Sequence, residues 1–105
     1  MVRIVAVADT HDYHALVLVP EGVLFIHAGD WTIHGAADAT ETFITWVASL
    51  PHQHKIIVAG NHDKAMSSDA PLYHDMKRLV DAQPTSTYLY DERVELRVGE
   101  RSISI

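Results

Sequence analysis

The chain has 105 residues, a length that accommodates a single domain spanning residues 1–105. Its 14 acidic residues outnumber 8 basic ones, for a net charge of −6. No run of Lys and Arg could follow a phosphate backbone, so a basic nucleic-acid-binding face is excluded. Cysteine is absent, which rules out disulfides and favours a reducing, cytoplasmic compartment. The apolar runs are too short for a signal peptide or a membrane span, so we expect no membrane partner.

Three short apolar runs rich in Val and Ile predict strands that are buried on both faces, as in a parallel sheet. They occupy residues 2–8, 23–27 and 55–59. The connection between the first two is expected to hold a short helix near residues 13–18. A longer helix is predicted before the third strand, because apolar residues recur on one helical face and Pro51 follows them. These apolar residues are Ala39, Phe43, Trp46, Val47 and Leu50. Strands alternating with helices indicate an α/β fold.

The second half of the chain predicts one more helix and a β-hairpin. The helix is expected over residues 71–82, with Asp69 as its N-cap. After residue 84 the pattern changes to strict alternation, which predicts two strands joined by a turn at Gly99-Glu100. The alternation runs to Ile105, so we expect a domain cut short at its C-terminal end. The open strand edge there favours self-association.

Each predicted parallel strand runs directly into a polar string. The strings are Asp9-Thr10-His11, Gly29-Asp30 and Gly60-Asn61-His62-Asp63. Open parallel sheets bind ligands at the carboxyl ends of their strands, so these side chains are expected to converge. Carboxylate, imidazole and carboxamide groups together suit hard or borderline divalent ions. An Asp that can bridge two ions is typical of a two-metal hydrolytic centre.

In this order, the three strings resemble the calcineurin-like metallophosphoesterases, whose pattern is D-x-H, G-D and G-N-H-D/E. The stretches at residues 27–30 and 50–63 are similar to the small metallophosphoesterase-domain-containing branch. The resemblance implies that the chain is a partial version of a two-sheet sandwich that holds two divalent ions, either Mn, Fe or Zn. It further implies hydrolysis of small phosphodiesters, such as cyclic nucleotides, by a metal-activated hydroxide.

The resemblance and the placement together give each metal-binding candidate a role. Asp9 and His11 are predicted ligands of the first ion, Asp30 is the predicted bridge, and Asn61 offers a neutral oxygen to the second ion. Each residue has an ordinary alternative. The Asp residues could serve in turns, His11 could be solvated, and Asn61 could be a left-handed turn residue.

His62 is the predicted proton donor to the leaving group, and Asp63 is predicted to hold its imidazole. The alternatives are a third metal ligand for His62 and a surface carboxylate for Asp63. His27 is expected to support the site or pack rather than bind metal. Trp31 could stack on a nucleobase or pack in the core. The other histidines are expected on the solvated surface, with His34 a weaker candidate for substrate phosphate; they are His14, His34, His52, His54 and His74.

One departure from the family keeps rival functions open. The family's second half carries further metal-binding histidines, two of them in a G-H-x-H string, and no such string occurs here. The chain could therefore be a non-catalytic interaction module with this fold, or half of an enzyme completed by another polypeptide. A Rossmann nucleotide-binding module is excluded because no G-x-G-x-x-G follows any strand.

Overall fold

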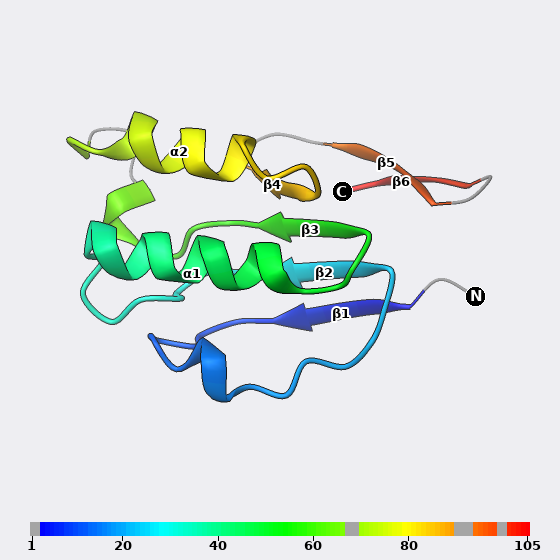
Figure 1. Ribbon diagram of the computed structural model, residues 1–105, viewed down its shortest axis with the longest axis horizontal. Coiled ribbons are helices and arrows are strands. Elements are labelled where there is room, and N and C mark those ends of the chain that lie inside the picture. Colours follow the sequence, from blue (N-terminus) through cyan, green and yellow to red (C-terminus); the bar gives the residue numbers. More distant parts are fainter. Residues whose placement is uncertain (1–2, 67–69, 90–93, 99–100) are drawn as a thin grey trace.

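A four-stranded parallel sheet, in the order β1-β2-β3-β4, forms the centre of the molecule. The computed structural model describes residues 3–66, 70–89, 94–98 and 101–105. The strands are β1 (Ile4–Val7), β2 (Leu24–His27), β3 (His54–Ile57) and β4 (Ser86–Tyr88). Helices α1 (Ala37–Ser49) and α2 (Tyr73–Asp81) pack on this sheet, and β5 (Glu95–Val98) pairs with β6 (Arg101–Ser104) as a separate antiparallel ribbon (Figure 1). Two short 3-10 turns complete the elements, η1 (His14–Leu16) and η2 (Lys64–Met66).

The predicted α/β fold, with three parallel strands and a C-terminal hairpin, is confirmed. Strand β4 was not predicted, because its three residues, Ser-Thr-Tyr, form no apolar run. The helix expected near residues 13–18 is only the single turn η1. Helix α2 begins after Leu72, which makes no side-chain cap. The predicted cap Asp69, the turn at residues 99–100 and the start of the first strand at residue 2 lie outside the described residues.

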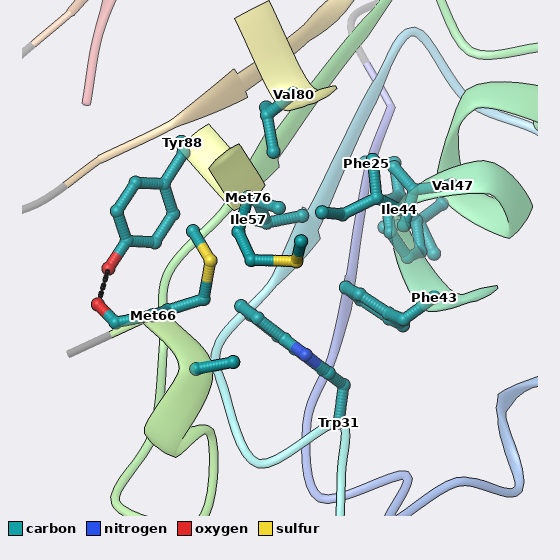
Figure 2. Packing of buried hydrophobic residues seen from close by; sticks show 12 residues of the cluster. Phe25, Trp31, Phe43, Ile44, Val47, Ile57, Met66, Met76, Val80 and Tyr88 are labelled. Carbon is teal, nitrogen blue, oxygen red and sulfur yellow. Dashed lines mark hydrogen bonds between the residues drawn. The ribbon is translucent and has the colours of Figure 1, made fainter. Parts of the chain in front are cut away.

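The main core lies between the helices and one face of the sheet (Figure 2). On this face of the sheet, Val5 of β1 lies beside Phe25 of β2. His27 of β2 lies beside Ile57 of β3. Trp31 stacks on Phe43 with ring centroids 4.5 Å apart and planes 5° from parallel. Trp31 is fully buried, so it packs in the core and is not available to stack on a nucleobase.

Two histidines, His14 and His52, are unexpectedly buried against this core. His14 lies against the rings of Phe43 and Trp46, and burial lowers its pKa. The His52 ring donates a hydrogen bond from Nε2 to the carbonyl oxygen of Pro20, at 3.0 Å. The surface positions predicted for both histidines are therefore wrong. Each ring lies among aromatic side chains that are distant from it in the sequence, so its sequence neighbours did not indicate burial.

Lys55 is also buried, and it satisfies the end of a helix. Its Nζ donates to the carbonyl oxygen of Ala48, in the last turn of α1, at 2.9 Å. The last carbonyls of a helix lack partners within the helix, and a cation there also interacts favourably with the helix dipole. Burial lowers the pKa of Lys55. No helix in the described part of the chain is both long and apolar enough to cross a membrane.

The opposite face of the sheet is only partly covered. Leu24 and Ile56 pack there against Leu96 of the hairpin. Ile4 and Val58 are on the same face by strand alternation, yet they are 52% and 38% exposed. An apolar sheet face open to water favours association.

We expect the isolated chain to self-associate through this face. Sizing chromatography over a range of concentrations should show a shift toward larger species as concentration rises. Val58→Ser should weaken the association because it makes the open face more polar. Leu18→Ser is the matched control, because Leu18 is 95% exposed but lies in the connection between β1 and β2. A concentration-independent monomer would contradict the prediction.

Candidate metal centre

The order of the sheet brings the polar strings together. Strands β1, β2 and β3 are neighbours and run parallel, so the loops that follow them meet at one edge. One ligand atom from each of Asp9, His11 and Asp30 lies within 4.8 Å of the others. The His11 Nε2 is 3.9 Å from Oδ1 of Asp9. These three predicted ligands therefore form one cluster.

The backbone at this cluster has an uncommon conformation. In the described part of the chain, positive φ angles outside glycine occur at Asp9 (57°), His11 (43°), Asp12 (68°) and Asp30 (58°). Residues with side chains rarely adopt this region, and such outliers gather at functional sites. Hydrogen bonds between the loops hold them there: the Asp9 N–H donates to Gly29 O at 3.0 Å, and the His11 N–H donates to Asp30 O at 3.1 Å. The strain is thus confined to the loops that carry the ligands.

Asn61 lies directly against the predicted bridging residue. The end of its side-chain amide is 3.1 Å from both carboxylate oxygens of Asp30 when nitrogen faces them as the donor. With the amide turned over, the Asn61 oxygen would join those of Asp30 in a set of oxygen ligands. Oδ1 of Asp30 also accepts the His62 backbone N–H at 2.9 Å. The structure thus places Asn61 beside the other candidates, and its role as a ligand stays a prediction.

Two glycines allow this close approach of the loops. Gly29 has a φ of 107°, and a Cβ added there would overlap the backbone of Gly60. A Cβ on Gly60 would in turn overlap the carboxylate and backbone nitrogen of Asp30. Only glycine fits at these two points, which explains why the second and third strings begin with one.

His62 lies beside the cluster, on the exposed side. Its ring centroid is 5.2 Å from that of His11, in an edge-to-face arrangement. The Nδ1 of His62 is 2.9 Å from the carbonyl oxygen of Ile33. A carbonyl oxygen only accepts hydrogen bonds, so Nδ1 is the donor. In the neutral ring Nδ1 therefore carries the hydrogen and Nε2 does not. The structure thus places His62 next to His11, and its role as proton donor stays a prediction.

Asp63 has a different partner from the one predicted. It is 2% exposed, so it is not a surface carboxylate. Its Oδ2 accepts the backbone N–H groups of Asp30 (2.6 Å) and Gly60 (2.8 Å), and its Oδ1 accepts that of Thr32 (2.9 Å). The carboxylate points inward from a tight turn, away from the neighbouring His62 ring, which Ile33 holds instead. Sequence reasoning missed Thr32 and Ile33, because neither residue type signals a role through its backbone.

His27 supports the site from beneath, as predicted. It is fully buried, and its Nδ1 accepts the Gly29 N–H at 3.2 Å. Its Nε2 is therefore protonated and donates to the Thr10 hydroxyl at 2.9 Å. The ring thus connects the loop after β1 to the loop after β2 in its neutral form. Burial lowers the pKa of His27 to about 4.

This pKa predicts a loss of stability in acid. The unfolded chain binds a proton on His27 more readily than the folded chain, so the ring's contribution is complete above about pH 6.5 and falls as pH drops toward 4. The shift corresponds to about 3 kcal/mol of unfolding free energy. Urea unfolding at pH 7 and pH 4.5 should show that the unfolding free energy decreases less on acidification in His27→Gln than in the original chain. An equal decrease in both proteins would contradict the assignment.

Comparisons with known proteins agree with this geometry. A family model described as calcineurin-like phosphoesterase matches residues 2–100. Metallophosphoesterase domain-containing protein 1 of Homo sapiens is 43% identical over 58% of this chain and 19% of its own length. The UPF0046 protein C25E10.12 of Caenorhabditis elegans is 42% identical over 59% of this chain and 23% of its own length.

A third relative is named for a different activity. The probable rhamnogalacturonate lyase C of Emericella nidulans is 34% identical over 94% of this chain, which corresponds to 9% of that protein. The chain thus spans less than a quarter of the length of each of these relatives. The lyase name describes a much longer protein, whereas the family model covers nearly all of this chain. On this match and on the ligand cluster that the strings form, the chain belongs to the calcineurin-like phosphoesterase family.

Proposed function

We propose that this chain carries metal ligands and the proton donor of a centre that hydrolyses phosphodiesters. The observation that supports the proposal most directly is the convergence of Asp9, His11 and Asp30 within 4.8 Å. Asn61 adds an amide against Asp30. This donor set suits hard and borderline divalent ions, so the residues fit the metals that the family implies.

The side chains would divide between two ions. Asp9 and His11 would bind the first, Asn61 would bind the second, and Asp30 would be shared by both. Divalent ions bound in such a pair activate water and neutralise charge on a phosphoryl group. They would also offset the negative field of a chain with a net charge of −6, which otherwise repels phosphate.

His62 would supply a proton to the departing oxygen. Because its Nδ1 is hydrogen-bonded to Ile33, the proton for transfer would be held on Nε2 of the doubly protonated ring. The ring is exposed beside the cluster, so a small phosphodiester can reach it. We propose small phosphodiesters, with cyclic nucleotides among them, as the substrate class. Manganese is our first choice of metal for the tests.

The first test measures metal binding alone. Calorimetric titration with manganese should show binding to the original chain and a strong loss in Asp30→Ala. The loss should exceed the roughly 10–100-fold that removal of an outer hydrogen-bonding partner causes. Asp81→Ala is the control, because this carboxylate on α2 is exposed and forms an ion pair with Lys77 at 3.6 Å, away from the cluster. Equal affinity in Asp30→Ala would remove the basis for a shared ligand.

The second test concerns the proton donor. In a fusion that adds a segment carrying a Gly-His-x-His string, manganese should support hydrolysis of an alkyl phosphodiester. His62→Gln should slow that reaction by on the order of 10²–10⁴. The variant should slow a nitrophenyl diester far less, because nitrophenolate leaves without a proton. Equal losses for both substrates would identify His62 as a ligand or phosphate-binding residue instead.

A further inference from the structure

Two consecutive backbone carbonyls hold the two imidazoles of the site. The Thr32 oxygen is 3.3 Å from Nδ1 of His11, and the Ile33 oxygen is 2.9 Å from Nδ1 of His62. Since a carbonyl only accepts, both rings carry their hydrogen on Nδ1 when neutral. Nε2 then carries no hydrogen in either neutral ring. In His11, Nε2 is the atom that faces Asp9.

These carbonyls belong to a short segment that is fixed by a buried carboxylate. Oδ1 of Asp63 accepts both the backbone N–H of Thr32 (2.9 Å) and its hydroxyl (3.0 Å). The same hydroxyl is 3.0 Å from the carbonyl oxygen of His62. Thr32 is fully buried and Asp63 is 2% exposed, so water does not compete for these bonds. On the exposed side, Asp12 accepts the Ile33 N–H at 3.2 Å.

We propose that Asp63 is a positioning residue that acts on both histidines through the backbone of Thr32 and Ile33. By holding this segment, Asp63 selects the Nδ1–H form of His11 and His62 and leaves Nε2 of each ring free. Nε2 of His11 is then available as a ligand, and Nε2 of His62 is available for proton transfer. These last two roles rest on the proposed function, whereas the choice of protonated nitrogen does not.

The test observes the ring nitrogens directly. Long-range ¹H–¹⁵N NMR of the metal-free chain at pH 8 reports which nitrogen of each neutral histidine carries hydrogen. The original chain should show the Nδ1–H form for His11 and His62. Asp63→Asn replaces one accepting oxygen with a donor, so both rings should shift toward a mixture of the two forms. His54 is an internal control, because its Nε2 donates to Arg97 O at 2.9 Å, remote from Asp63 in the fold.

A matched pair of variants keeps the proposal testable if Asp63→Asn does not fold. Thr32→Val removes the hydroxyl that bonds to Asp63 and His62, while Thr32→Ser retains it. We expect the Val variant to shift both rings in the same direction as Asp63→Asn, and the Ser variant to match the original chain. Nδ1–H forms that persist in a folded Asp63→Asn, or in Thr32→Val, would overturn the proposal.

Metal titration separates this proposal from the proposed function. Manganese affinity should fall roughly 10–100-fold in Asp63→Asn, the usual effect of losing an outer partner of metal ligands. Asp81→Asn should leave affinity and ring forms unchanged. If the original chain binds no manganese, the proposed function fails, yet the NMR result still decides whether Asp63 positions the rings. If manganese binds but the ring forms do not respond to Asp63 or Thr32, the positioning role fails alone.

Discussion

The buried carboxylate of Asp63 is the interaction on which the geometry of the site depends. A charge away from water is tolerated only when hydrogen bonds replace its hydration. Asp63 meets that requirement with the N–H groups of Asp30, Gly60 and Thr32 and with the Thr32 hydroxyl. The loops after β2 and β3 must therefore lie against one another, since separating them would leave the charge unpaired. The glycines at positions 29 and 60 allow that contact.

The loop after β1 is held by a different type of bond. Its backbone donates to the oxygens of Gly29, Asp30 and Trp31, and its Thr10 hydroxyl accepts from the neutral, buried ring of His27. Left-handed angles at Asp9, His11 and Asp30 cost energy, and the bonds around them are what make this conformation persist. A site arranged in this way is preorganised, because its candidate ligands would not need to be gathered for a cation to bind.

The positions of the candidate ligands could be predicted from the sequence because two simple rules decide them. Apolar Val- and Ile-rich runs form buried parallel strands, and the residues after such strands meet at one edge. The direction of individual side chains could not be predicted in this way. Asp63 follows His62 directly, yet a tight turn sends its carboxylate inward while the imidazole stays exposed. Nothing in the amino-acid sequence distinguishes the directions of these two side chains.

The same limit explains the buried histidines and the short fourth strand. His14 and His52 have no apolar neighbours in a periodic pattern, and only tertiary contacts with Phe43, Trp46 and Phe25 show that they are in the core. Strand β4 is defined by pairing with β3 rather than by its own composition. The hydrophobic pattern of a segment predicts strands and helices that have an apolar face of their own. Strand β4 and the burial of His14 and His52 depend instead on contacts with distant segments.

The carboxylates of the site differ in burial, and this difference separates their roles. Asp9, Asp12, Asp30 and Asp63 lie on or beneath the same edge of the sheet, in a chain whose net charge is −6. Only the carboxylate of Asp63 is largely enclosed by hydrogen-bond donors and buried; Asp9 is exposed and Asp30 is half-buried. The inner carboxylate therefore organises the loops, while the outer carboxylates keep accepting capacity for a cation. A phosphate anion alone would be repelled by the outer groups, so under the proposed function a cation would have to bind at this edge before a phosphoester.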